Sequence, residues 1–228
     1  MGAMNIISRS SRIFTSRAEA ALLLSEKLGV FRKDHPVVLG IPRGGVVIAR
    51  HLARELECDL DVVLAHKLGA PANRELAIGA VCESAECFID KKIACAVGAS
   101  DEYIEREKQA QLELMGARID SYRQILPKTD LAGRVVIVTD DGVATGATMK
   151  AALWSVRQDE AKQIIAALPV GPSDSIENLA EVADVVICLE TPPYFSAIGQ
   201  FYVHFDQVAD SEVLEILRHE QERRCRHE

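Results

Sequence analysis

Two adjacent carboxylates follow a run of apolar residues in the segment RVVIVTDDGVATGATMKAAL, which spans positions 134–153. Asp140 and Asp141 end the apolar run, and a loop of small residues then leads into a segment with helical composition. Glycines let the backbone approach a ligand closely, and a helix start offers unpaired N–H groups that bind phosphate. Carboxylates repel phosphate but bind hydroxyl groups or hydrated Mg²⁺. The segment therefore predicts a ligand with a phosphate at one end and neighbouring hydroxyls in its middle.

Other phosphate-handling motifs do not fit this loop. A Walker A loop needs a lysine at the position that Ala147 holds. A dinucleotide fingerprint needs the spacing G-x-G-x-x-G, which Gly142 and Gly146 do not supply. An aspartyl phosphatase needs a second acid at position 139, where the sequence has a threonine.

Two further loops carry residues suited to an anionic ligand. The segment GIPRGGV contains Arg43, whose guanidinium is suited to phosphate, followed by Gly44 and Gly45, whose N–H groups are exposed. The segment KLGAPANREL at 67–76 begins with Lys67 at a predicted strand end and continues as a polar loop with Arg74 and Glu75. Each loop also has a simpler interpretation, a tight turn with a surface arginine in the first case and a solvated surface loop in the second.

The elements that would position these loops are short apolar strands alternating with helices. Continuous apolar runs are expected to form strands buried on both faces of a mostly parallel sheet, and ligands bind such sheets at the carboxyl ends of the strands. A polar residue opens several of the predicted helices, as Ser16 does with Glu19 in a capping box. We predict strands at 36–40, 60–66, 134–140, 163–170 and 183–190, an antiparallel pair at 77–82 and 87–90, and helices starting near 16, 46, 100, 146, 175 and 210.

The acidic segment resembles the phosphoribosyl pyrophosphate (PRPP) signature of type I phosphoribosyltransferases over about 13 consecutive positions. The motifs PRGG and DDGVATGAT look most like a bacterial subgroup of predicted phosphoribosyltransferases. The resemblance implies an α/β fold with a mostly parallel five-stranded sheet flanked by helices, and a small hood lobe above it. It implies a single domain over 1–228, with a core at about 17–190, a hood from the N-terminal segment and about 190–208, and a C-terminal helix at about 210–224.

The resemblance also implies roles for the residues of the three loops. Asp140 and Asp141 would hold the ribose hydroxyls, directly or through the waters of Mg²⁺, and Arg43 and Lys67 would neutralise pyrophosphate. Arg74 and Glu75 would belong to a mobile catalytic loop, and a non-proline cis peptide would lie near Arg43–Gly44. The full predicted PRPP-binding set is Arg43, Gly44, Gly45, Lys67, Asp140, Asp141, Gly142, Val143, Ala144, Thr145, Gly146, Ala147 and Thr148.

The aromatic C-terminal segment would form most of the hood, together with the N-terminal residues IFTSR. Planar rings can stack on a nucleobase, so the predicted acceptor-binding residues are Tyr194, Phe195, Ile198 and Phe201. Packing of a small lobe is the alternative interpretation. The 6-oxopurine members of the family carry an aspartate where this chain has Ala144, so transfer to hypoxanthine or guanine by that route is not expected.

The resemblance implies transfer of ribose 5-phosphate from PRPP to a nitrogenous, nucleobase-like acceptor, with Mg²⁺ as cofactor and release of pyrophosphate. Two alternatives remain, a PRPP-binding regulator without transfer activity and a hydrolase of PRPP or a phosphosugar. The net charge of −8 argues against a nucleic-acid partner. Because no apolar run approaches the roughly 20 residues that span a bilayer, we expect a cytoplasmic protein without a membrane segment. A homodimer is expected only by analogy with the family.

Overall fold

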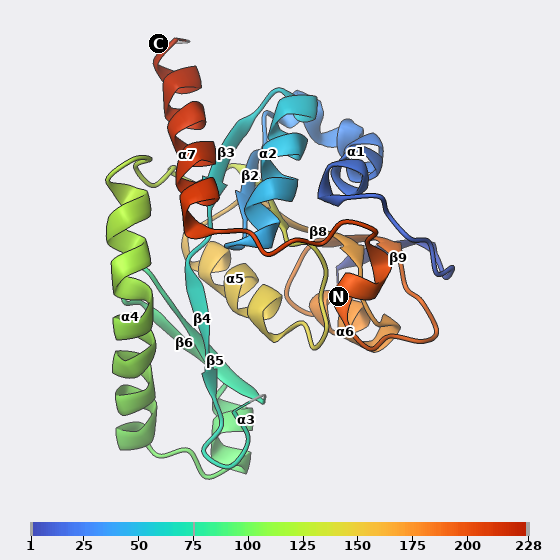
Figure 1. Ribbon diagram of the computed structural model, residues 1–228. Helices are drawn as coiled ribbons and strands as arrows, with labels where there is room; N and C mark the ends of the chain where they lie inside the picture. The colour runs from blue at the N-terminus through green and yellow to red at the C-terminus, as the bar shows by residue number, and fades with distance from the viewer. Residues whose placement is uncertain (1, 75, 227–228) are drawn as a thin grey trace.

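A parallel sheet of six strands forms the centre of the protein, whose computed structural model describes residues 2–74 and 76–226 (Figure 1). The strands lie in the order β1-β9-β8-β7-β2-β3, and every neighbouring pair in this sheet is parallel. This sheet carries the strand ends that precede two of the three predicted loops, at β2 and β7. The strand bounds are β1 (Ala3–Ser8), β2 (Val37–Gly40), β3 (Asp59–Val62), β7 (Val135–Thr139), β8 (Gln163–Val170) and β9 (Val185–Glu190).

The sixth strand corrects the prediction of a five-stranded sheet. β1 pairs in parallel with β9, with Ala3 opposite Val185 and Ser8 opposite Glu190. Its sequence, AMNIIS, lacks the continuous apolar run that marked the other strands. An edge strand needs fewer apolar residues than a central strand because only part of its surface is buried, and Met4 is 42% exposed.

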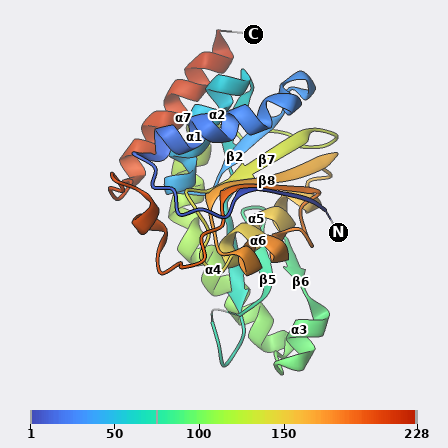
Figure 2. The same cartoon turned by 90° about the vertical axis from the view of Figure 1, so that its right-hand side faces the viewer.

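Helices cover both faces of the sheet (Figure 2). One hydrophobic cluster joins the first, second and last helices to one face, and a separate cluster joins α5 and α6 to the other. This layering explains why the central strands are apolar at nearly every position, since consecutive side chains point to opposite covered faces. The bounds are α1 (Arg17–Leu28), the 3₁₀ helix η1 (Gly29–Asp34), α2 (Gly44–Leu56), α5 (Ala147–Gln158), α6 (Ser173–Leu179) and α7 (Asp210–Cys225).

A small antiparallel sheet extends from the main sheet beside α5 (Figure 1). The strand predicted at 60–66 is divided in the structure, because β3 ends at Val62 and a new strand begins at Ala65. The antiparallel pair predicted at 77–82 and 87–90 is confirmed. The small sheet packs on α4 through Leu68, Ile78 and Met115. Its elements are β4 (Ala65–Gly69), β5 (Ala77–Cys82), β6 (Cys87–Ile89), α3 (Lys91–Ala96) and α4 (Asp101–Arg123).

The predicted helix starts are largely confirmed, with one altered cap. Ser100 accepts a hydrogen bond from the Tyr103 N–H at 3.2 Å and opens α4. Ser16 accepts from the Glu19 N–H at 3.5 Å, but the Glu19 carboxylate bonds to Thr15 N rather than to Ser16. The bond from a backbone N–H to the Glu19 carboxylate, which a capping box places at the N-cap Ser16, is therefore made one residue earlier, at Thr15.

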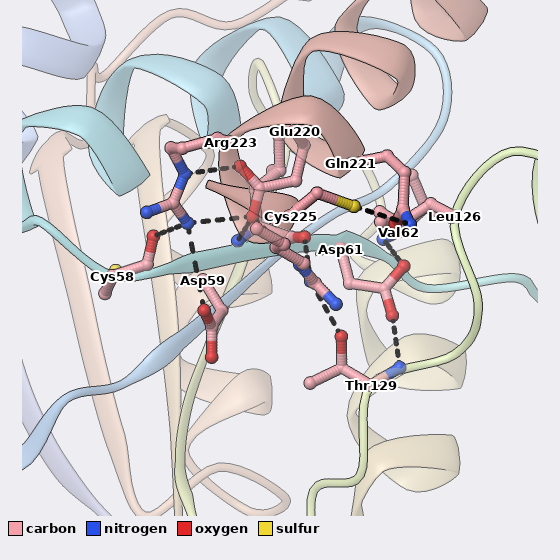
Figure 3. A network of polar contacts seen from close by, with 12 residues as sticks. Cys58, Asp59, Asp61, Val62, Leu126, Thr129, Glu220, Gln221, Arg223 and Cys225 are labelled. Atoms are coloured by element: carbon pink, nitrogen blue, oxygen red, sulfur yellow. Dashed lines mark hydrogen bonds and ion pairs between the residues drawn. The ribbon is translucent and has the colours of Figure 1, made fainter. Parts of the chain in front are cut away.

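The exposed edge of β3 is covered by side chains rather than by another strand (Figure 3). Glu220 of α7 accepts from the Leu60 N–H at 3.2 Å, and Arg224 donates to the Leu60 carbonyl at 2.7 Å. Arg223 donates to the Cys58 carbonyl at 2.9 Å, and Arg123 of α4 donates to the Val62 carbonyl at 3.1 Å. These bonds occupy backbone groups that would otherwise be open to pairing with another chain.

Candidate active site

Two loops lie side by side at the carboxyl ends of β7 and β2. They are the acidic loop, residues 140–148, and the PRGG loop, residues 42–45. Gly40 is paired with Thr139 across these strands, and the Ile41 N–H donates to the Thr139 carbonyl at 3.0 Å. Because both strands are central and parallel, the residues that follow them must leave the sheet at the same edge. The structure thus brings together two of the three loops that the sequence singled out.

Gly44 is in direct contact with the acid pair. A Cβ at this position would overlap the Asp141 carboxylate, so no other residue fits here without moving the acid. Gly45 packs against Asp140, since a Cβ on Gly45 would come within 3.0 Å of Asp140 Oδ1, and the Asp140 carboxyl group accepts from the Asp141 N–H at 2.8 Å. The cis peptide joins Pro42 and Arg43, one bond earlier than the predicted position near Arg43–Gly44.

Asp141 forms an ion pair that the sequence analysis missed. The Nε and Nη2 atoms of Arg17 lie 2.8 and 2.7 Å from Asp141 Oδ2, and the side chains are 11% and 12% exposed. Arg17 also donates to the Asp206 carbonyl at 3.0 Å and lies over the Phe205 ring, 4.1 Å from its centroid. One local signal was available: an arginine in the first turn of a helix opposes the helix dipole, and therefore calls for another binding partner.

The two acids share too little positive charge to be fully neutralised. Burial, together with the adjacent Asp141 carboxylate, raises the pKa of Asp140 well above its usual range. Burial also raises the pKa of Asp141, although Arg17 opposes this shift. Among residues 2–74 and 76–226, a single guanidinium forms an ion pair with these two carboxylates, so the pair is suited to a further cation.

The loop of small residues after the acids leads into α5 as predicted. Gly146 has φ +74° and precedes the first helical residue, a backbone conformation that glycine adopts without a steric penalty. Ala144, Thr145 and Thr148 are not buried, and the Ala144 carbonyl is held by the Ser175 hydroxyl at 2.7 Å. The N–H groups of the first turn of α5 therefore face an open loop that a short helix, α6, holds in place.

The three predicted cationic residues, Arg43, Lys67 and Arg74, lie on different parts of the fold, unlike the adjacent acids. Arg43 is the residue before α2 and extends toward Asp210 at the start of α7, with 3.8 Å between Nη1 and Oδ2. Lys67 lies within β4, opposite Ala80, which corrects its predicted place at the end of a strand. Arg74 is 79% exposed and lies 3.9 Å from Glu107 of α4. Glu75 lies outside the described residues.

The two segments that were predicted to form the hood contact each other beside the acidic loop. The Phe14 N–H donates to the Phe201 carbonyl at 2.8 Å, and Phe14 forms a parallel bridge with Tyr202. The buried Tyr202 hydroxyl donates to the Asp141 carbonyl at 2.7 Å. A Cβ on Gly142 would come within 2.8 Å of Ile198, so the hood packs directly on the acidic loop.

The predicted acceptor-binding residues differ in how accessible they are. Phe201 is 2% exposed and belongs to the core, so in this conformation its ring cannot stack on an acceptor. Phe195 is half-buried, with its ring centroid 5.3 Å from that of Phe201, and Ile198 is also half-buried. Tyr194 is 85% exposed. Tyr194, Phe195 and Ile198 therefore remain the accessible part of the predicted set.

Whether the site can bind a metal ion depends on which side chains of the described residues are grouped together. Among residues 2–74 and 76–226, no three His, Cys, Asp or Glu side chains are grouped so that they could hold a metal ion by themselves. A cation at Asp140 and Asp141 would therefore need oxygen ligands from a bound molecule or from water.

Over residues 2–74 and 76–226, no helix has the length and apolar character to cross a membrane.

The comparisons with known proteins place the chain in a family. Residues 11–206 match the model of the phosphoribosyl transferase domain, and the chain belongs to this family. Two proteins of Mycobacterium tuberculosis, from strains CDC 1551 and H37Rv, are provisionally named phosphoribosyl transferases and are 36% identical to this chain over 206 residues. The match covers 90% of this chain and 46% of each relative, so the chain spans about half the length of the curated relatives.

A solved structure confirms the fold at higher identity. The crystal structure of TT1426 from Thermus thermophilus has 42% sequence identity and a TM-score of 0.87. The match covers 91% of this chain and 98% of that chain. The fold therefore agrees with that of a solved structure over 91% of this chain.

Proposed function

We propose that this chain is a phosphoribosyltransferase that binds PRPP with Mg²⁺ and transfers ribose 5-phosphate to a nitrogenous acceptor. The observation that carries the proposal is the position of Asp140 and Asp141. They lie between the loop of small residues at the start of α5 and the PRGG loop, in which Gly44 contacts Asp141 and Gly45 contacts Asp140. A molecule with a terminal phosphate, ring hydroxyls and a second anionic group matches this order of donors and acceptors.

The 5-phosphate would bind at the start of α5. The small residues of the 144–148 loop add little bulk, and the first N–H groups of the helix point toward an incoming anion. The hydroxyls of Thr145 and Thr148 add side-chain donors. This part of the site needs no positively charged side chain.

The ribose hydroxyls would bind at the acid pair. Hydroxyl groups donate to carboxylates, and the surplus negative charge at Asp140 and Asp141 suits Mg²⁺, a cation that prefers oxygen ligands. When bound, Mg²⁺ would stabilise the negative charge that develops on the departing pyrophosphate. Arg17 holds Asp141 in a fixed orientation, and the Asp141 N–H does the same for Asp140.

The reaction itself would exchange two bonds at C1 of the ribose. The bond from C1 to the pyrophosphate oxygen breaks with its electron pair, and a nitrogen of the acceptor forms a bond to C1 and loses a proton. Arg43 would neutralise part of the charge on pyrophosphate. The hood would exclude water from the sugar cation, because Ile198 and Tyr202 pack on the acidic loop.

A panel of acceptors tests the proposal. The protein is incubated with PRPP and Mg²⁺ in the presence of single nucleobases and related nitrogen heterocycles, and pyrophosphate release is measured. Release that depends on one acceptor, together with formation of its ribonucleotide, is the expected result. Release without any acceptor would instead show a hydrolase, and tight PRPP binding without release would show a regulator.

A further inference from the structure

Two arginines from different helices converge on one carboxylate beside the candidate site. Arg118 Nε of α4 lies 3.2 Å from Asp210 Oδ1, and Arg43 Nη1 lies 3.8 Å from Asp210 Oδ2. The Tyr122 hydroxyl donates to Asp210 Oδ1 at 2.9 Å. Asp210 is the first residue of α7, so the cluster joins three separate parts of the fold.

The charges in this cluster do not balance. Two guanidinium groups face a single carboxylate, and the described residues give neither arginine a second acidic partner. The Arg43, Arg118 and Asp210 side chains are 32%, 38% and 46% exposed, whereas Tyr122 is fully buried. The cluster is therefore open to solvent on the side of the three charged groups, with Tyr122 behind them.

The cluster is connected to the acid pair through the PRGG loop. Arg43 directly precedes Gly44, and Gly44 is in contact with the Asp141 carboxylate. An anion bound by Arg43 would thus lie near Gly44, the residue that contacts the Asp141 carboxylate. Arg118 lies on α4, which packs against both α7 and β4, the strand that carries Lys67.

We propose that Arg118 adds a second guanidinium to the diphosphate subsite that the proposed function gives to Arg43, and that Asp210 occupies this subsite in the free protein. Carboxylate and phosphate oxygens bind guanidinium donors in the same way, but a diphosphate carries more charge and more acceptor oxygens. PRPP would displace the Asp210 carboxylate, which then turns toward solvent. This inference rests on the proposed function, since it assigns one group of the proposed substrate.

Binding measurements on matched variants test the subsite. Isothermal titration calorimetry with Mg²⁺ compares PRPP, pyrophosphate and ribose 5-phosphate, which has no diphosphate. Asp210→Asn removes a competing charge and should raise the affinity for PRPP and pyrophosphate roughly two- to fivefold, the range expected for an exposed ion pair. Arg118→Gln removes a charged donor and should lower both affinities about tenfold or more. Neither variant should change binding of ribose 5-phosphate.

Control variants separate the subsite from a general charge effect. Glu212→Gln removes the same charge from the same turn of α7, and Arg106→Gln removes an exposed guanidinium from α4. Both should leave all three affinities unchanged, and melting curves confirm that every variant is folded. Unchanged or weaker PRPP binding in Asp210→Asn, or unchanged PRPP binding in Arg118→Gln, overturns the inference.

The design also distinguishes this inference from the proposed function. A wild-type protein that binds neither PRPP nor ribose 5-phosphate contradicts the proposed function. In that case the affinity for pyrophosphate tests the subsite, which predicts an increase in Asp210→Asn and a decrease in Arg118→Gln. If PRPP and ribose 5-phosphate bind but the variants do not separate them, the proposed function stands and the subsite is wrong.

Discussion

Two regions of this molecule group several carboxylates away from water, and their neighbours differ. At the edge of β3, Arg123 lies 2.7 Å from Asp61 and binds Glu83 through two nitrogens, at 2.6 and 2.8 Å. Burial opposes the charge of Arg123, but Glu83 and Asp61 outweigh it, so the pKa of Arg123 is raised. Arg223 and Arg224 bind Glu220 nearby (Figure 3). In this region each acid has a close cation.

At the end of β7 the acids outnumber the cation that binds them. Asp140 and Asp141 share Arg17, and the pKa of each acid is raised. Both regions keep acids away from water, which is costly unless the charge is paired. The paired acids of the β3 edge fix α4 and α7 to the sheet. At β7 one ion pair joins Asp141 to α1, and the second acid adds negative charge that a cation-dependent ligand would bind.

The largest effect should come from removing the central cation of the paired region. Arg123→Met leaves Asp61 and Glu83 without a partner and uncovers the Val62 carbonyl, so we expect a loss of about 3–5 kcal/mol in the free energy of unfolding. Urea denaturation measures it. Arg157→Met breaks an ion pair whose side chains are 39% exposed, and should cost less than about 1 kcal/mol. Similar losses in the two variants would remove the distinction between the regions.

Removing the acids of the unpaired region should affect binding rather than folding. Asp140→Asn combined with Asp141→Asn should lower the affinity for PRPP with Mg²⁺ at least about 100-fold, equivalent to roughly 3 kcal/mol, while the fold is kept. Calorimetry and melting curves check both statements. The matched control replaces Asp101 and Glu102, two adjacent exposed acids at the start of α4, by their amides. Unchanged PRPP affinity in the Asp140/Asp141 variant would contradict the site.

A smaller effect is expected at Arg17. Arg17→Met leaves one buried carboxylate without its partner, so we expect a loss of about 2 kcal/mol in stability, below that of Arg123→Met. Mg²⁺ should recover part of this loss because it supplies the missing positive charge at Asp141. The measurement is thermal unfolding with and without Mg²⁺. A variant that Mg²⁺ does not stabilise more than wild type would argue against a cation site at the acids.

The smallest effect is a dependence of stability on pH. The pKa of Asp140 is raised in the folded state, so its ionisation is less favourable there than in the unfolded chain. Wild type should therefore lose stability from this group as the pH rises above about 4 and through the folded pKa. Asp140→Asn lacks this loss, so its stability relative to wild type should increase from about pH 4 to about pH 8. Urea denaturation across this range checks the sign, and a constant difference would contradict the raised pKa.

Local patterns were enough to predict much of the fold and part of the site. The apolar runs of β2, β7, β8 and β9 mark buried strands because each side chain on them meets a covered face. The acidic loop also has its signature within a few consecutive residues. The sixth strand, the division of 60–66 at Val62 and the position of Lys67 could not be predicted, because they depend on pairing with distant segments.

The sequence by itself determined that two carboxylates follow a buried strand and precede a loop of small residues at a helix start. Those features are set by side-chain size and backbone freedom over neighbouring residues. Only the tertiary structure decided which cation meets which acid. Arg17 reaches Asp141 across 124 positions of the chain, and Arg123 reaches Asp61 across 62. Charge pairing depends on distance in space and on burial, and neither is recorded in the local order of residues.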